Sequence, residues 1–426
     1  MLALGARLVQ RGHEVTFETW SRWRSDVEDA GMRFLPAPEY PLFEGGSGIG
    51  SEMYEAVLLA TRHTRTAVAE VRPNVLVHDI LTLAPALAGE LEDVPVATLV
   101  PHLYPVGGPG FPPYALGARF PRTRIGRGLW DSVARRTEGG LRQGRDELNR
   151  TRSILGLAPV GRLHGGLSER LCLVGTFPQL EYPRRWPAGV EVVGPLMWEP
   201  PFGEVAPPPG EQPLVLVAPS TAQDPDHRLL RAALGGLGEL PIRVLATWNR
   251  RPLGGPVRVP ANTRLVEWVS YAKTMPSCAL VICHAGHGTM ARALACGCPV
   301  LAVPHVGDMA ENAARADWAR VGVRLPWRFL TPRALGLAVT RALSGPGLTV
   351  RARELAAWAA RHNGATRAAE LVEELAGQSS AAARPRMYSM SSGASPSTTS
   401  IGSPEQLQSS TTARSSLTSS ARQIAP

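Results

Sequence analysis

Residues 279–312 read ALVICHAGHGTMARALACGCPVLAVPHVGDMAEN, and this stretch decides the fold. An apolar run leads into a glycine-rich turn, residues with helical spacing follow from about Thr289, and a second apolar run precedes another helical segment. Apolar strands that alternate with helices are typical of a parallel sheet with helices on its faces. We therefore expect an α/β fold in which the glycine turn joins a strand to a helix.

The same alternation continues on both sides of this stretch. The first helix is predicted from the spacing of Leu2, Leu4, Leu8 and Val9, and further helices are expected near 53–71 and 84–91. The expected strands are 15–17, 75–77, 96–100, 214–217, 243–246, 279–283 and 300–303. We predict two Rossmann-like domains, because a chain of 426 residues is too long for one ordinary core.

The boundary between the two domains is predicted at residues 199–213, EPPFGEVAPPPGEQP, because proline neither continues a helix nor pairs inside a sheet. The domains are then 1–198 and 214–376. Residues 377–426 are rich in Ser, Thr, Ala and Pro, so we expect a disordered tail. The loop Gly45–Gly50 has no strand before it, and we interpret it as a flexible loop rather than a phosphate loop.

Bulk composition excludes several classes of protein. The chain has no apolar run of 18 residues and no secretory pattern in residues 1–15, so we expect no stable membrane insertion and a cytoplasmic location. The formal charge is +9, but the arginines are scattered and Lys273 is the only lysine, so no nucleic-acid partner is expected. The cysteines near residue 283 lack the paired spacing of a zinc site, and no metal is expected.

The glycine turn has the chemistry of an anion site. Gly286 and Gly288 have no Cβ, so backbone can approach a diphosphate that the free N–H groups of a helix N-terminus favour. His284 would donate a hydrogen bond and Thr289 its hydroxyl, although His284 also fits a structural role in the turn. The spacing of the glycines also matches a dinucleotide-binding enzyme, with Asp308 as either the ribose carboxylate or a helix N-cap.

An ordered set of residues around this turn resembles the donor-site signature of the UDP-glycosyltransferase superfamily, as in bacterial natural-product glycosyltransferases. The matching residues are 283–289, 296–299, Pro304, Asp308, Asn312, Ala313 and Gly322, with weaker matches at 11–17, 193–195 and 268–269. The resemblance implies the GT-B fold, in which the first domain binds the acceptor and the second binds a nucleotide-diphosphate sugar.

The resemblance also implies roles for individual residues. The donor site would comprise Ser220, Thr221, Trp268, the Val269 backbone, His284, Gly286, Gly288, Thr289, Asp308, Met309 and Asn312. Trp268 would face the nucleobase, although a single tryptophan is equally a core residue. Asp224-Pro225-Asp226 resembles a metal-binding pair, but it opens a helix and the superfamily needs no metal or cofactor, so we interpret it as a helix cap.

The implied reaction is inverting transfer, in which a base removes the proton of an acceptor hydroxyl that attacks the anomeric carbon. Asp79 matches the aspartate that orients this base. The family's catalytic histidine has no counterpart, because Met1–Leu4 resembles the helix that follows the catalytic turn, so the first strand is expected to be missing. His102 is a second catalytic candidate, and His13 is expected to be structural. A nucleotide-sugar-binding homologue without catalysis remains an alternative.

Two departures from the family pattern concern the donor. Arg292 replaces a glutamate that binds both ribose hydroxyls, and Met309 replaces a glutamine that pairs with Asp308 on the sugar. Methionine offers only a weak acceptor, so a dTDP-deoxysugar is favoured over a UDP-sugar. The aromatic residues of the loop 105–124 favour a small hydrophobic natural product as the acceptor.

Overall fold

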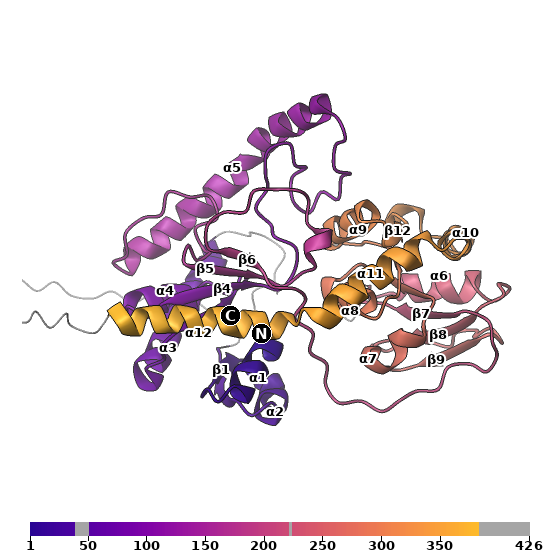
Figure 1. Ribbon diagram of the computed structural model, residues 1–426, viewed down its shortest axis with the longest axis horizontal. Helices are drawn as coiled ribbons and strands as arrows, with labels where there is room; N and C mark the ends of the chain where they lie inside the picture. The colour runs from indigo at the N-terminus through magenta and orange to yellow at the C-terminus, as the bar shows by residue number, and fades with distance from the viewer. Residues whose placement is uncertain (39–50, 221–223, 383–426) are drawn as a thin grey trace, which may run out of the picture. The chain divides into compact units, whose positions relative to one another are not determined.

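The computed structural model of the chain describes residues 1–38, 51–220 and 224–382, and Figure 1 shows its helices and strands. The loop Gly45–Gly50, Thr221 and residues 383–426 of the expected tail lie outside the described residues. None of the described helices is long and apolar enough to cross a membrane.

The first half of the chain forms a parallel sheet of four strands with the order β3-β4-β5-β6. Their bounds are Leu76–Asp79, Val96–Val100, Leu171–Val174 and Val190–Val192. A separate parallel pair is formed by β1 (Thr16–Thr19) and β2 (Arg33–Pro36). The helices of this half are α1 (Leu2–Gln10), α2 (Arg24–Asp29), α3 (Ser51–Val71), α4 (Ala84–Leu91) and α5 (Arg124–Ile154). The predicted helices and strands of this half are confirmed to within a few residues.

The second half forms a parallel sheet of six strands with the order β12-β11-β10-β7-β8-β9. In chain order the strands β7 to β12 are Leu214–Ala218, Arg243–Thr247, Thr263–Val266, Leu280–Cys283, Val300–Ala302 and Gly322–Arg324. The helices α6 to α11 are Arg228–Gly236, Tyr271–Thr274, His287–Ala295, Met309–Trp318, Pro332–Leu343 and Gly347–Arg361. Residues 199–213 between the two sheets contain neither helix nor strand.

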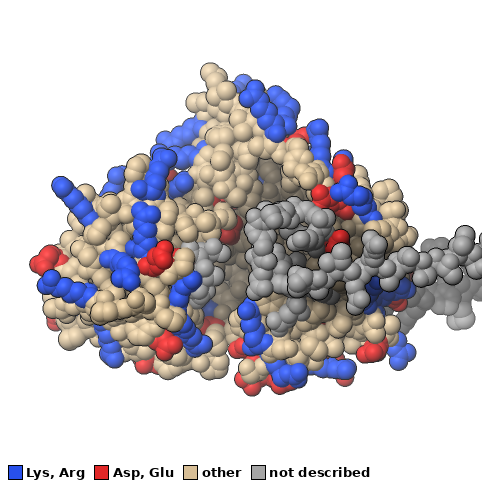
Figure 2. Space-filling model, turned by 180° about the vertical axis from the view of Figure 1, so that it is seen from behind, with Lys and Arg blue, Asp and Glu red and all other residues tan. Residues whose placement is uncertain are grey.

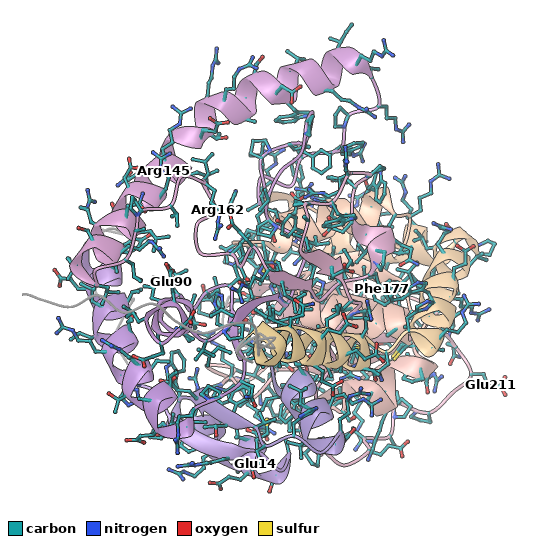
Figure 3. All side chains as sticks on the ribbon, turned by 60° about the vertical axis from the view of Figure 1, so that its left-hand side comes forward. Glu14, Glu90, Arg145, Arg162, Phe177 and Glu211 are labelled. Atoms are coloured by element: carbon teal, nitrogen blue, oxygen red, sulfur yellow. The ribbon has the colours of Figure 1, made fainter. Side chains whose placement is uncertain are left out.

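Both faces of the six-stranded sheet are buried, as its continuous apolar strands require. Alternate residues enter two different clusters: Val215 and Ile282 pack with α6 and α10, whereas Leu216 and Val281 pack with α8 and α11. Phe177, labelled in Figure 3, comes from the first half of the chain but is fully buried in the cluster that packs with α8 and α11. The two halves therefore share part of one core.

The last described helix, α12 (Gly364–Ala382), packs against the four-stranded sheet of the first half (Figure 1). Ala368, Leu371 and Val372 lie in one cluster with Leu99 and Leu173. This helix corrects two expectations. Residues 377–382 are helical rather than disordered. Residues 364–376, which were assigned to the second domain, belong instead to the core of the first sheet. The buried apolar face of the helix supplies the stabilisation that its sequence alone does not reveal.

Basic side chains are spread over the face of the molecule in Figure 2 and do not gather into one stripe. Many are paired locally, as in the ion pair between Arg142 and Glu138 on α5, where the shortest N–O distance is 2.8 Å. Arg152 near the end of α5 binds both carboxylate oxygens of Glu90 (labelled in Figure 3) at 2.7 Å and so joins α5 to α4.

Candidate donor site

The glycine turn lies at the carboxyl end of β10, between Cys283 and the start of α8 at His287. The helix begins two residues earlier than predicted, with Gly286 at its N-cap. Ala285 has a positive φ of 63°, and Asn312 holds this strained turn by donating from Nδ2 to the Ala285 carbonyl at 2.9 Å. A Cβ added at Gly286 or Gly288 would meet nothing within 4 Å among the described residues, so this side of the turn is open.

A cavity of about 260 Å³ lies at this turn. Its lining includes seven residues that the sequence assigned to a donor site: Ser220, Trp268, His284, Gly286, Gly288, Thr289 and Met309. The remaining lining residues are Ala218, Pro219, Asn249, Tyr271, Cys283 and His287. The free amides at the start of α8 and the glycine positions together form a cradle that suits a phosphate group. Val269, Asp308 and Asn312 do not line this cavity.

His284 is 1% exposed, and both of its ring nitrogens face the protein. Its Nδ1 accepts a hydrogen bond of 2.9 Å from the backbone N–H of Ser220. Its Nε2 is buried and lies 3.3 Å from the Asp224 carboxylate, close enough for an ion pair but without the geometry of a hydrogen bond. The geometry therefore differs from the expectation that His284 donates directly to a diphosphate.

Asp224 caps α6, as the sequence indicated for Asp224-Pro225-Asp226. Its Oδ1 accepts from the Arg228 N–H at 2.9 Å, and its Oδ2 accepts from the Leu229 N–H at 3.0 Å. Burial alone would raise the pKa of Asp224, but the contacts with His284 and with the two amides outweigh it and lower this pKa to about 2. The contact with His284 was missed, because the two residues lie far apart in sequence.

Trp268 stacks on Tyr271, with ring centroids 5.8 Å apart, and the Arg250 guanidinium lies 5.1 Å from the Trp268 ring. The indole N–H of Trp268 is buried and has no hydrogen-bond partner among the described residues. Tyr271 hydrogen-bonds with Asn249 and with Thr289, and burial raises the pKa of its phenol. Trp268 thus combines packing with a position at the cavity wall.

Asp308 and Asn312 organise the start of α9. Asp308 occupies the N-cap position, but its carboxylate accepts from Asn312 Nδ2 at 3.0 Å instead of capping a backbone amide. Asn312 is fully buried, and Met309 is 8% exposed at the cavity. Val269 is fully buried in the core, so only its backbone remains as a contact for a nucleobase.

The two catalytic candidates lie at the carboxyl ends of neighbouring strands. Asp79 ends β3, and its Oδ1 accepts from the Leu81 N–H at 2.9 Å. His102 follows β4, and its Nδ1 lies 2.8 Å from the Leu103 carbonyl and 3.2 Å from the Tyr114 hydroxyl. A carbonyl only accepts, so Nδ1 of His102 carries the proton and its Nε2 is the basic nitrogen.

His287 lies within the matching range 283–289, but the sequence analysis gave it no role of its own. It lines the cavity, and its Nε2 lies 2.9 Å from the hydroxyl of the fully buried Thr176, which follows β5. Burial, with a smaller effect of His102, lowers the pKa of His287 to about 3. His287 therefore stays neutral and links the donor cavity to the first half of the chain. No group of three or more His, Cys, Asp or Glu among the described residues is placed to hold a metal ion.

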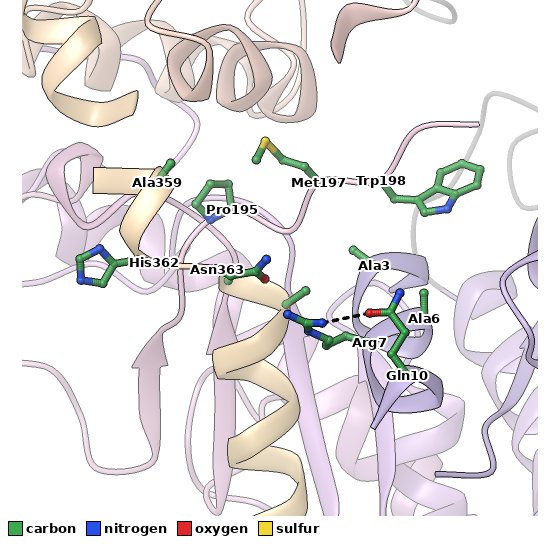
Figure 4. A pocket seen from close by; sticks show the side chains of 12 residues that line it. Ala3, Ala6, Arg7, Gln10, Pro195, Met197, Trp198, Ala359, His362 and Asn363 are labelled. Carbon is green, nitrogen blue, oxygen red and sulfur yellow. Dashed lines mark hydrogen bonds between the residues drawn. The ribbon is translucent and has the colours of Figure 1, made fainter. Parts of the chain in front are cut away.

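A second cavity of about 320 Å³ lies between α1, residues 195–198 and the start of α12 (Figure 4). Arg7 projects into this view and donates to Gln10, and its other nitrogens donate to the Thr366 hydroxyl. None of the predicted site residues lines it. We therefore assign the donor site to the cavity at the glycine turn, because its lining has the predicted residues although its volume is smaller.

His13 has the structural role expected for it. Its Nε2 lies 2.7 Å from the Glu373 carboxylate, which also binds Arg11 at 2.7 Å. Glu373 lies on α12, so these contacts hold the end of α1 against the last helix. The Arg11 and His13 contacts lower the pKa of the half-buried Glu373 to about 2.

Comparison with known proteins identifies relatives of the chain. Residues 231–375 match the family described as "Erythromycin biosynthesis protein CIII-like, C-terminal domain". The chain is 28% identical to 4'-demethylrebeccamycin synthase of Lentzea aerocolonigenes over 88% of this chain and 96% of that protein. It is 29% identical to O-mycaminosyltylonolide 6-deoxyallosyltransferase of Streptomyces fradiae, over 88% of this chain and 94% of the relative.

A solved structure supports the fold. The glycosyltransferase VinC in complex with dTDP has a TM-score of 0.65 at 18% identity, covering 89% of this chain and 96% of VinC. The dinucleotide-binding alternative gains no support from these matches, and Asp308 pairs with Asn312 rather than following a strand as a ribose carboxylate. The chain is a GT-B glycosyltransferase with an EryCIII-like C-terminal domain, similar to the glycosyltransferases of antibiotic biosynthesis.

Proposed function

We propose that the chain transfers a deoxysugar from a dTDP donor to a hydroxyl of a small hydrophobic natural product, with inversion at the anomeric carbon. The observation that carries this proposal is the cavity at the start of α8, which joins an open glycine turn to Trp268 and Met309. Amides at a helix N-terminus stabilise the charge that develops on the departing diphosphate. Trp268 supplies an aromatic wall against which a nucleobase can pack.

The preference for a deoxysugar is supported by Met309, which lines the cavity with a thioether where a hydroxyl-binding amide would otherwise stand. Arg292 does not line the cavity, so it adds less support than the sequence indicated. The known relatives point the same way, since one acts as a 6-deoxyallosyltransferase and VinC is solved with dTDP. Desolvating sugar hydroxyls without offering partners is costly, and a deoxysugar avoids part of that cost.

For the chemical step we propose His102 as the base on the acceptor side. Its Nε2 is the basic nitrogen, and the electrostatic effect of His102 on His287 indicates that it neighbours the donor cavity. Asp79 lies at the same edge of the first sheet, where a carboxylate would orient a basic group or an acceptor hydroxyl. The hydroxyl proton would pass to His102 while the oxygen attacks the anomeric carbon and the diphosphate leaves.

Binding and turnover test this proposal. Calorimetry should show dTDP binding at least about tenfold more tightly than UDP, a difference of roughly 1.4 kcal/mol. A dTDP-6-deoxyhexose should be the better donor, and Met309→Gln should raise the use of UDP-glucose. His102→Gln should lower kcat by about 100-fold or more without weakening dTDP binding. Tighter binding of UDP, with UDP-glucose as the better donor, would refute the donor assignment.

A further inference from the structure

Asp224 lies outside the glycine-turn signature, yet it touches the histidine of that signature. Its carboxylate is 2% exposed and is fixed on one side by the amides of Arg228 and Leu229 at the start of α6. On the other side its Oδ2 lies 3.3 Å from His284 Nε2. A buried carboxylate that is tied to a helix in this way is a rigid partner for the imidazole.

The hydrogen bond at the other ring nitrogen fixes where the proton of His284 resides. Nδ1 accepts from the Ser220 N–H at 2.9 Å, and a nitrogen that accepts a hydrogen bond carries no proton. The proton of the neutral ring is therefore on Nε2, which faces Asp224. A doubly protonated ring would place two donors, Nδ1–H and the Ser220 N–H, against each other.

Neither nitrogen is available to a ligand in this arrangement. Nδ1 is occupied by Ser220, and Nε2 has no exposed surface, so a phosphate oxygen reaches it only if Asp224 moves away. Ser220 follows β7 and itself lines the cavity. His284 lines the cavity, but its nitrogens bear on a ligand there only through the Ser220 backbone that Nδ1 restrains.

We propose that Asp224 is a positioning residue for the nucleotide diphosphate. It holds His284 as the Nε2–H tautomer, and Nδ1 of His284 in turn fixes the Ser220 backbone at the edge of the donor cavity. His284 then acts on the donor through Ser220 rather than by direct contact. This inference rests on the proposed function, because it takes the cavity to be the diphosphate site.

The tautomer can be measured without any donor. Nitrogen NMR of the ¹⁵N-labelled protein between pH 6 and 8 should show His284 with a protonated Nε2 and an unprotonated Nδ1, assigned by the signal that His284→Gln removes. Asp224→Asn should shift the ring toward the Nδ1–H tautomer or a mixture. Asp226→Asn removes the same charge at an exposed neighbour and should leave the spectrum unchanged. A wild-type ring protonated at Nδ1 would overturn the proposal.

Two substitutions at His284 separate the positioning role from direct contact. The side-chain oxygen of asparagine can take the place of Nδ1 and accept from Ser220, whereas the amide of glutamine reaches the place of Nε2. Calorimetry with dTDP alone should therefore show His284→Asn within about threefold of wild type and His284→Gln weakened by about tenfold or more. The reverse order would show that Nε2 contacts the diphosphate directly, and the proposal would fail.

Asp224→Asn should weaken dTDP binding by about fivefold or more, while Asp226→Asn leaves it unchanged. If Asp224→Asn does not fold, the comparison of the two His284 variants still decides the matter, with melting temperature as the check on each. If the wild-type chain binds neither dTDP nor UDP, the proposed function fails. The NMR result then still decides whether Asp224 sets the tautomer of His284.

Discussion

Arg315 on α9 offers a direct test of how the first half of the chain supports the donor site. Its guanidinium is 2% exposed and lies between two carboxylates, with Nε 2.8 Å from Glu311 and Nη1 3.1 Å from Glu181. Nη1 also donates to the Leu180 carbonyl at 3.3 Å, and the charged carbon lies 3.5 Å from the centre of the Tyr182 ring. Glu181 also accepts from the Tyr104 N–H at 2.8 Å.

We expect Arg315→Met to lower the free energy of unfolding by about 3 to 5 kcal/mol, the usual cost of leaving buried charges without their partner. Methionine fills much of the same volume, so the loss reflects charge more than packing. The triple variant Arg315→Met, Glu181→Gln, Glu311→Gln should recover most of the loss, because it removes the two stranded carboxylates. The loss should also be smaller at pH 5 than at pH 8, since stranded buried carboxylates take up protons and become neutral.

Urea denaturation followed by tryptophan fluorescence measures these differences. Arg142→Met is the matched control, because Arg142 pairs with Glu138 on the exposed face of α5 and its loss should cost no more than about 0.5 kcal/mol. A change below about 1 kcal/mol for Arg315→Met, or a triple variant no more stable than the single one, would refute the reasoning.

Two further perturbations test the other contacts between the halves and the role of the last helix. The folded-state pKa of His287 is about 3 and the unfolded one about 6.5, so protons bind the unfolded chain preferentially and stability falls by up to about 1.4 kcal/mol per pH unit below 6.5. His287→Gln should therefore flatten the decline of melting temperature between pH 6.5 and 4.5, whereas His13→Gln, at an exposed site, should not. Ending the chain after Glu370 should cost more than about 5 kcal/mol, because it removes three buried apolar side chains of α12. Ending it after residue 382 should leave the melting temperature unchanged, and a clear drop there would contradict the expected disordered tail.

The sequence predicted the elements that local periodicity defines. Four of the six strands of the second sheet and the glycine turn were identified in this way, because apolar runs and turn residues mark them without knowledge of distant contacts. The two edge strands β9 and β12 were not predicted. Helix α5 was missed because five glycines interrupt its 31 residues, and glycine disfavours a helix interior. The predicted acceptor loop ends at Arg124, where this helix begins.

The donor site was predicted in part for the same reason. The residues of the turn, with Trp268 and Met309, meet at one cavity as expected, since the carboxyl ends of parallel strands share one edge of a sheet. The contacts of Asp224 with His284 and of His287 with Thr176 join segments at least 60 residues apart, and no local pattern encodes such pairs. The family resemblance predicted that His284 contacts the ligand, whereas in the structure its two ring nitrogens contact Ser220 and Asp224.

The return of α12 to the first sheet has a consequence for synthesis on the ribosome. The last strand of that sheet ends at Val192, and the helix that completes its core begins only at Gly364. At elongation rates of about 5 to 20 residues per second, the nascent first half waits roughly 9 to 34 seconds for the intervening 170 or so residues, with the apolar surface around Leu99 and Leu173 uncovered. The core of the first half is therefore completed only after α12 has been synthesised, and a nascent chain stalled before Gly364 should be a preferred client of chaperones that bind exposed apolar surface.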